Sequence, residues 1–238
     1  MVYEGTDSSG TGTTCRPVVA TLAIMDVAVT DHLLSTTRSV RLKLDLQRPV
    51  EEEVLADCLR LALQAPTPGG AQSWRWLVVR DQSVKNALGK LFRSVGEEYL
   101  RAAVAAAGDA ASSGPFARMV RSGQHLIDVI EQVPVLVIPC LTGRPQGGNA
   151  DLSVFYGGIF PAVWNFQLAL RSRGLGSTLT SYHLRHEQEA AEILGIPDDV
   201  TQVGLLPVAY TTVPDFKVAP RTPVEQVAYL DHWGSPLG

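Results

Sequence analysis

The stretch APTPGGAQSWRWLVVRD, Ala65–Asp81, joins an unusually stiff turn to the start of a strand. Pro66, Pro68 and two glycines fall within five positions, although most turns need only one glycine or proline. The run Trp74–Val79 alternates and then becomes apolar, which predicts a strand. Such a turn either holds its backbone against a flat or bulky group or is only an awkward connection between a helix and a strand.

The composition indicates a globular protein that buries a large core. The 238 residues suffice for one sizeable domain, and 45% are hydrophobic whereas 18% are charged. The formal net charge of −4 excludes a general nucleic-acid binder, which needs a basic face. Three cysteines without paired spacing favour a cytoplasmic protein with buried thiols.

The amino-terminal residues are rich in Gly, Ser and Thr, and they lack periodicity. The apolar run Pro17–Val29 contains Asp26 and follows Glu4 and Asp7, whereas a secretory signal begins with positive charge. No apolar run approaches the roughly 20 residues that span a bilayer. We therefore expect an amino-terminal arm, residues 1–28, one domain over residues 29–238, and no membrane segment.

Helical and strand patterns alternate along the rest of the chain, which is typical of α/β or α+β proteins. The patterns predict helices that begin at Thr30 or Asp31, follow Pro49 until Pro66, extend from Val84, cover Ser153–Arg173, and end at Gly195. The fully apolar run Val133–Leu141 predicts a strand at the centre of a sheet, and Val203–Tyr210 predicts the last strand.

Motif searches exclude several chemistries. His183, His186 and Glu187 lack the spacing of a zinc site, so no metal is predicted. The chain has no nucleophile elbow, dinucleotide fingerprint or phosphate loop. Arg38, Ser39, Arg41 and Arg221 remain. Guanidinium forks match phosphate oxygens, although a solvated basic turn is the alternative interpretation.

The chain resembles the FMN-dependent nitroreductase family in five ordered segments between Asp31 and Val227. They are TTRSVRLK, LQAPTPGGAQSWRWLVVRD, RSRGLGSTLTSYH, AAEILGIPDDV and VAPRTPVEQV. The resemblance implies an α+β fold, with a central mixed β-sheet flanked by helices. It also implies a homodimer with FMN at the interface, built partly from each chain.

The same resemblance assigns roles at the cofactor. Ser39 and Arg221 would hold the FMN phosphate, with Arg38 nearby, although Thr37 replaces the usual first arginine. Arg41 would lie beside flavin N1 and the C2 carbonyl, where a positive charge tunes the ring. The residues implied along the isoalloxazine are Pro66, Thr67 and Pro68 from the partner chain, Gln72, Thr180 and Ser181. Gly70 and Ser73 depart from the family pattern there.

The function implied is an NAD(P)H-dependent, FMN-containing oxidoreductase. It would reduce nitroaromatic or quinone-like acceptors by ping-pong hydride transfer, from NADH or NADPH, without a catalytic acid–base pair. A reductive deiodinase is one alternative, but this chain has no lysine between Lys90 and Lys217. A protein that sequesters FMN without turnover is another. The small residues of Gly108–Phe116 would then form a lid rather than a gate.

Overall fold

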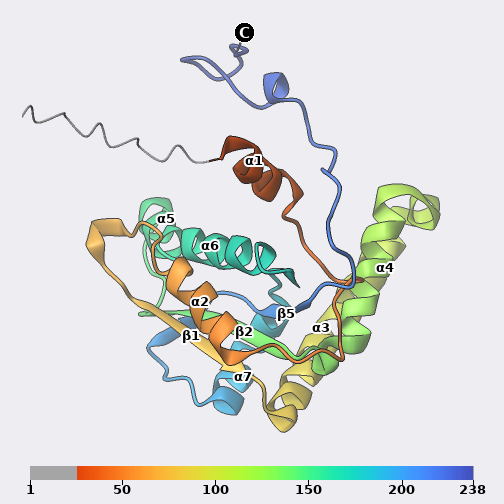
Figure 1. Ribbon diagram of the computed structural model, residues 1–238, viewed down its shortest axis with the longest axis vertical. Coiled ribbons are helices and arrows are strands. Elements are labelled where there is room, and N and C mark those ends of the chain that lie inside the picture. Colours follow the sequence, from red (N-terminus) through yellow and green to blue (C-terminus); the bar gives the residue numbers. More distant parts are fainter. Residues whose placement is uncertain (1–25, 238) are drawn as a thin grey trace, which may run out of the picture.

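The computed structural model describes residues 26–237, which form a central sheet covered by helices on both faces (Figure 1). The strands are β1 Trp74–Val79, β2 Val135–Thr142, β3 Leu175–Ser177, β4 Val200–Gln202 and β5 Leu206–Tyr210. Their order is β1-β2-β5-β3, and β4 also pairs with β2. All of these pairings are antiparallel. The α+β prediction is confirmed, but the predicted mixed sheet is wrong for the described residues, because neighbouring strands in this sheet all run antiparallel.

Strand β2 is the centre of the core, as its apolar sequence predicts. Successive side chains point to opposite faces of a strand. Val135, Val137 and Leu141 accordingly join the cluster beneath one helical layer, whereas Leu136 and Ile138 join the cluster beneath the other. The two faces are therefore buried independently, and each supports a different set of helices.

Residues 26–237 contain seven α-helices around the sheet. They are α1 Val27–Thr36, α2 Glu52–Ala62, α3 Gln82–Ala107, α4 Gly114–Val129, α5 Asn149–Gly157, α6 Phe160–Arg171 and α7 Glu187–Leu194. Helix α2 packs on α6 over one face, and α3 packs on α4 and α7 over the other. Short 3₁₀ turns occupy Pro68–Gly70, Gly108–Ser112, Ile130–Gln132, Tyr182–His186 and Val224–Gln226. None of the helices within residues 26–237 combines the length and apolarity that crossing a bilayer requires.

Two helix predictions are wrong in their bounds. Helix α1 begins before Thr30, because the Asp26 carboxylate accepts a hydrogen bond from the Val29 N–H at 3.1 Å and caps the first turn. The single helix predicted over Ser153–Arg173 is two helices, α5 and α6. Pro161 lies in the first turn of α6, where its missing N–H costs nothing, and the chain turns at Gly158 just before it.

The predicted C-terminal end is confirmed for α7, whereas α2 ends earlier than predicted. Helix α7 ends at Gly195 as predicted, with φ +65° in the left-handed region. Helix α2 ends at Ala62, a few residues before Pro66. Residues 1–28, the proposed amino-terminal arm, lie outside the described residues except for the last three, so this division of the chain stays a prediction.

The segment Gly108–Phe116 connects α3 to α4, which pack together as a helical hairpin on the right of Figure 1. Gly108 and Gly114 have φ values of +52° and +75°, conformations that favour glycine. The segment is thus a tight hairpin tip rather than a long loop. Its assignment as a lid or a gate stays a prediction.

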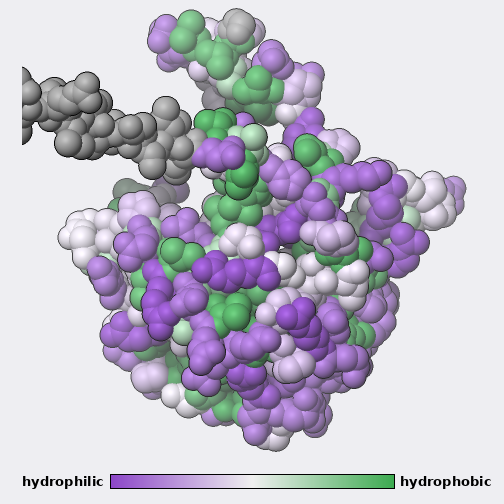
Figure 2. All heavy atoms as spheres, in the orientation of Figure 1, coloured by the Kyte–Doolittle hydropathy of each residue, from purple (hydrophilic) through white to green (hydrophobic). Residues whose placement is uncertain are grey.

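Residues 213–237, here the C-terminal arm, run past α1 and away from the sheet (Figure 1). The arm exposes several large apolar side chains, and Trp233 is 90% exposed. Figure 2 shows hydrophobic side chains gathered on this arm and on α1. Helix α6 also exposes Phe160 and Trp164, one helical turn apart. Such surface is unusual for a chain that functions alone.

Candidate functional site

The segment that follows α1 is held against the sheet beside β3. The Val40 N–H donates to the Ser177 carbonyl at 2.9 Å. A Cβ atom at Gly176 would lie 2.9 Å from the Val40 side chain, so only glycine permits this close approach. Because Val40 points into the core, the flanking Ser39 and Arg41 remain accessible.

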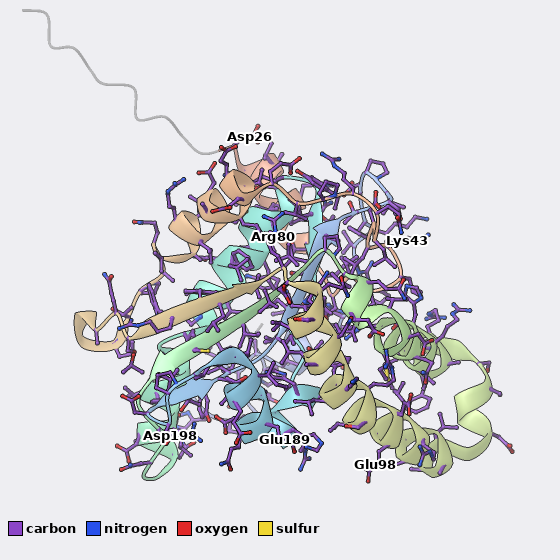
Figure 3. The ribbon with its side chains drawn as sticks, turned by 90° about the horizontal axis from the view of Figure 1, so that it is seen from below. Asp26, Lys43, Arg80, Glu98, Glu189 and Asp198 are labelled. Atoms are coloured by element: carbon purple, nitrogen blue, oxygen red, sulfur yellow. The ribbon has the colours of Figure 1, made fainter. Side chains whose placement is uncertain are left out.

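This segment forms one wall of a cavity of about 170 Å³, here the basic cavity. Its lining residues are Arg38, Ser39, Val40, Arg41, Leu42, Lys43, Ser122 and Phe216. No carboxylate forms an ion pair with Arg38, Arg41 or Lys43 among the described residues. Figure 3 labels Lys43 on the loop beside α4. A concave group of unneutralised cations beside hydroxyl groups suits an anion such as phosphate.

The start of the C-terminal arm closes one side of the basic cavity. Arg38 Nη1 donates to the Lys217 carbonyl at 2.9 Å. The preceding Asp215 forms an ion pair with Arg171 of α6, and its carboxylate lies 3.0 Å from Nε2 of His32 in α1. These contacts fix residues 215–217, so the cavity has a defined shape within one chain.

Arg41, which lines the basic cavity, also interacts with Tyr182. Burial lowers the pKa of the Arg41 guanidinium, and the nearby Tyr182 phenol acts in the opposite direction. The pKa of Tyr182 is raised by burial and by Tyr99, against the effect of Arg41. The Arg41 charge is therefore retained in a partly desolvated place, where its interaction with an anion is stronger than in water.

A second cavity, here the tyrosine cavity, has a volume of about 620 Å³ and lies between α3 and the turn Tyr182–His186. Its lining residues are Val95, Glu98, Tyr99, Ala102, Ser181, Tyr182, Arg185 and His186. Thr180 precedes Ser181 in the chain, and the Thr180 hydroxyl donates to the Leu205 carbonyl at 2.9 Å. Ser181 is exposed at the cavity wall, as its predicted role requires.

Tyr182 is held in a stack of aromatic rings. Its ring centroid lies 5.0 Å from that of Phe92 and 5.6 Å from that of Tyr99. Gly96 of α3 makes room for it, because a Cβ there would lie 2.7 Å from Ile127 and 3.0 Å from Tyr182. This packing fixes the turn that presents Ser181.

The turn Pro66–Gln72, here the proline turn, lines neither the basic cavity nor the tyrosine cavity. Gly69 and Gly70 adopt φ values of +58° and +73°. Pro66, Pro68 and Gln72 are exposed, and Thr67 is half-buried. The turn is stiff, yet it presents its prolines to the surface of its own chain.

Trp74 explains how the proline turn is anchored. Its ring is buried, and Nε1 donates to the Gly158 carbonyl at 2.6 Å. Trp76 is half-buried and packs on Phe166, with ring centroids 5.5 Å apart. Both tryptophans therefore belong to the core, and the turn is fastened to the junction of α5 and α6.

One chain does not bring the proline turn to the basic cavity. The basic cavity lies beside β3, and the proline turn leads into β1 at the opposite edge of the sheet. Val40 hydrogen-bonds to Ser177, which aligns through Val208 of β5 with Val135 at the start of β2. Trp74 instead pairs with Leu141 near the end of β2. Typical strand dimensions make the separation of Val40 and Trp74 about 20 Å along the strands and about 19 Å across them.

Arg221 also lies apart from the basic cavity, which it does not line. It is exposed on the C-terminal arm, and its Nη1 donates to the adjacent Pro220 carbonyl at 3.1 Å. The structure therefore groups Arg38, Ser39 and Arg41 at the basic cavity and places Ser181 at the tyrosine cavity, with Thr180 next to Ser181 in the chain. Pro66, Thr67, Pro68, Gln72 and Arg221 are not grouped with them in a single chain.

The remaining reactive side chains carry structural roles. Cys58 and Cys140 are buried free thiols, and burial raises their pKa to about 11 and about 12, which makes them unreactive near neutral pH. Cys15 lies outside the described residues. No cluster with metal-ligand chemistry occurs within residues 26–237. His183 and His186 belong to the 3₁₀ turn Tyr182–His186 that precedes α7.

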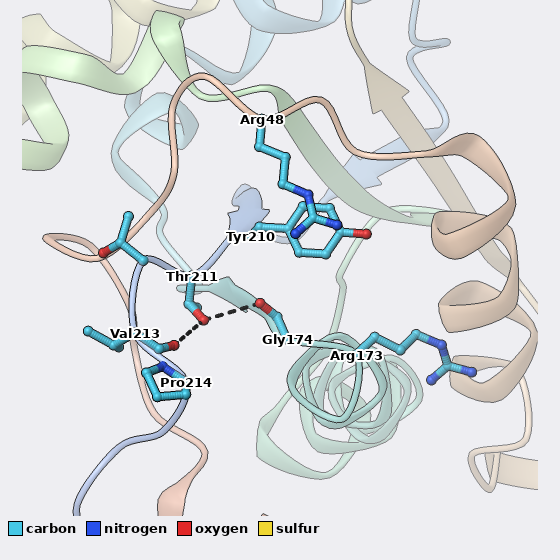
Figure 4. A pocket seen from close by; sticks show the side chains of 8 residues that line it. Arg48, Arg173, Gly174, Tyr210, Thr211, Val213 and Pro214 are labelled. Atoms are coloured by element: carbon cyan, nitrogen blue, oxygen red, sulfur yellow. Dashed lines mark hydrogen bonds between the residues drawn. The ribbon is translucent and has the colours of Figure 1, made fainter.

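A third cavity, of about 460 Å³, contains two arginines but its polar groups are already engaged (Figure 4). Arg48 lies 3.4 Å above the Tyr210 ring, and the Tyr210 hydroxyl donates to Glu51 at 2.6 Å. Thr211 donates to the carbonyls of neighbouring turns. Arg173 points away from Arg48 in Figure 4. The contacts among the side chains that line this cavity stabilise the fold around β5.

Sequence reasoning missed several lining residues. Lys43, Ser122 and Phe216 join the basic cavity, and Glu98, Tyr99 and Arg185 join the tyrosine cavity. Lys43 had a local signal, since it follows Arg41 in the same segment. The others come from distant segments, and tertiary packing alone brings them to these places.

Comparison with known proteins assigns the chain to a family. A sequence model of the nitroreductase family matches residues 34–210. The chain belongs to the nitroreductase family. A relative from Archaeoglobus fulgidus, whose provisional name is NADH dehydrogenase/NAD(P)H nitroreductase, is 24% identical over 180 residues, covering 75% of this chain and 83% of the relative. The predicted family is thus confirmed.

Solved structures share the fold. Oxidized iodotyrosine deiodinase bound to FMN and 3-iodo-L-tyrosine is 18% identical with a TM-score of 0.62, covering 85% of this chain and 97% of that chain. Nitroreductase A from Vibrio parahaemolyticus is 17% identical with a TM-score of 0.63, covering 87% and 77%. At these identities the likeness establishes the nitroreductase-like α+β architecture.

Proposed function

We propose that this nitroreductase-family flavoprotein is an FMN-dependent NAD(P)H oxidoreductase that reduces nitroaromatic or quinone-like acceptors. One observation carries the proposal: Arg38, Arg41 and Lys43, three cations without an ion-pair partner within residues 26–237, line a single cavity beside the exposed Ser181. Such a concentration of positive charge in a concave site attracts an anion.

The residues present fit FMN. Arg38, Ser39 and Lys43 would bind the phosphate, whereas the Ser122 hydroxyl already donates to the Met119 carbonyl at 3.0 Å. Arg41, partly desolvated, would stabilise negative charge on the ring. Bound FMN supplies the hydride acceptor and donor for a ping-pong exchange between nicotinamide and acceptor. Thr180 and Ser181 would orient the ring edge.

A homodimer would complete this site. The proline turn and the basic cavity lie at opposite edges and ends of one sheet, so a second chain must supply the turn that closes a flat slot over the ring. Exposed Phe160, Trp164 and Trp233 provide apolar surface for such an assembly. We propose that Pro66, Thr67, Pro68 and Gln72 of one chain face Arg41 of the other, and that Arg221 reaches the phosphate in the same assembly.

The test is an anaerobic titration of the purified protein, followed by its visible spectrum. We expect FMN to co-purify, to bleach on addition of NADH or NADPH, and to recover its colour on addition of a nitroaromatic acceptor. A protein that takes up no added FMN would refute the cofactor assignment. If dithionite bleaches the FMN but neither nucleotide does, the protein sequesters FMN instead.

A further inference from the structure

The tyrosine cavity combines an aromatic surface with one basic wall. Val95, Tyr99 and Ala102 recur at helical spacing on α3, so one face of this helix lines the cavity. The Tyr99 side chain is 52% exposed and rests against Tyr182. A planar ligand can therefore stack on Tyr99 without displacing any core side chain.

The charged groups of the cavity are mostly unpaired. Arg185 forms neither a hydrogen bond nor an ion pair within the described residues, and the same holds for Glu98, which Figure 3 labels on α3. His186 is engaged with Glu189 at 3.0 Å. Arg185 is thus the cation available to a ligand, and its guanidinium matches the two oxygens of a carboxylate.

We propose that the tyrosine cavity binds the electron acceptor and selects planar aromatic monocarboxylates, with the ring on Tyr99 and the carboxylate on Arg185. Glu98 disfavours a second negative charge on the same ligand by like-charge repulsion. The inference deepens the proposed function and rests on it, because Ser181 joins this cavity to the predicted flavin edge.

Binding to the FMN-loaded protein, measured by calorimetry, tests the inference without turnover. The probes are 4-nitrobenzoate and 4-nitrobenzamide, which share a ring but differ in charge. We expect the carboxylate to bind more tightly, and Arg185→Gln to weaken its binding roughly tenfold while leaving the amide unchanged. The matched control is Arg101→Gln, which removes an exposed arginine of α3 outside this cavity.

A second variant tests the role of Glu98. The substitution Glu98→Gln should tighten the binding of the dianion 5-nitroisophthalate and leave 4-nitrobenzamide unaffected, because only repulsion is removed. The inference is wrong if the wild-type protein binds carboxylate and amide equally, or if Arg101→Gln weakens carboxylate binding as much as Arg185→Gln does.

These outcomes separate the inference from the proposed function. Charge selection that depends on Arg185 supports the cavity assignment even if neither nicotinamide nucleotide bleaches the FMN, in which case the oxidoreductase proposal alone fails. Conversely, rapid reduction of both probes without charge selection retains the oxidoreductase and overturns the acceptor assignment.

Discussion

Protonation of His183 should destabilise the protein between pH 7 and pH 5. The side chain is fully buried, and neither ring nitrogen has a hydrogen-bond partner among the described residues. Burial lowers its pKa from 6.5 to about 4, although Glu187 acts in the opposite direction. The unfolded chain therefore binds the proton more readily than the folded chain does.

The sign and size follow from this difference. Stability is complete above the unfolded pKa of 6.5 and falls as the pH drops toward the folded pKa of about 4. Linkage gives a loss of about 2 kcal/mol between pH 7 and pH 5, and about 3 kcal/mol in full. Because His183 lies in the turn that follows Ser181, the tyrosine cavity should loosen with it.

Urea unfolding of the wild type and His183→Gln, at pH 7 and pH 5 with saturating FMN, measures this contribution. The variant should be less stable at pH 7, because the core is perturbed, but should lack about 2 kcal/mol of the acid-induced loss. His232→Gln, which removes an exposed histidine of the C-terminal arm, is the control and should keep the wild-type pH dependence. Equal acid-induced losses in the wild type and His183→Gln would refute the reasoning.

Three further substitutions test other parts of the account. Arg41→Ala should lower the reduction potential of bound FMN, because negative charge on the reduced ring loses the neighbouring positive charge. Arg41→Lys should lower the potential less. An unchanged potential in a spectroelectrochemical titration would show that Arg41 does not lie beside the ring. Arg221→Ala should weaken FMN binding roughly ten- to a hundredfold in fluorescence titrations, and unaltered affinity would show that the exposed arginine never reaches the phosphate. Trp74→Phe deletes the hydrogen bond to the Gly158 carbonyl and leaves that buried group unsatisfied, which should cost about 1–3 kcal/mol of unfolding free energy; a loss as small as that of an exposed substitution such as Tyr99→Phe would contradict the anchoring role.

The sequence predicts the two longest strands, β1 and β2, well because their signals are local. Trp74–Val79 and the apolar run ending at Leu141 are both strands, since periodicity and apolarity reflect which faces are buried. The three-residue β4, Val200–Gln202, carries too little pattern to be recognised. The break between α5 and α6 was also missed, because apolar side chains continue through it, even though Pro161 marks the new helix start.

In the candidate site, too, the residues that are close in sequence were predicted and those from distant segments were missed. Arg38, Ser39 and Arg41 were predicted together because they lie close together in the sequence. Ser122 joins them only because α4 packs beside this segment, and no local pattern indicates that contact. The direction of pairing in the sheet likewise depends on long-range packing, so the expectation of a mixed sheet had no local test.

Mixing of two defective variants measures most directly whether two chains share one FMN site. One variant carries Arg38→Ala and Arg41→Ala, and the other carries Thr67→Trp, which fills the slot from the proline turn. Neither should retain FMN alone. After unfolding together and refolding, half of the dimers should be mixed, each with one intact site, so about a quarter of the wild-type FMN should return. Absence of any recovery, with both variants folded and dimeric, would contradict the shared site.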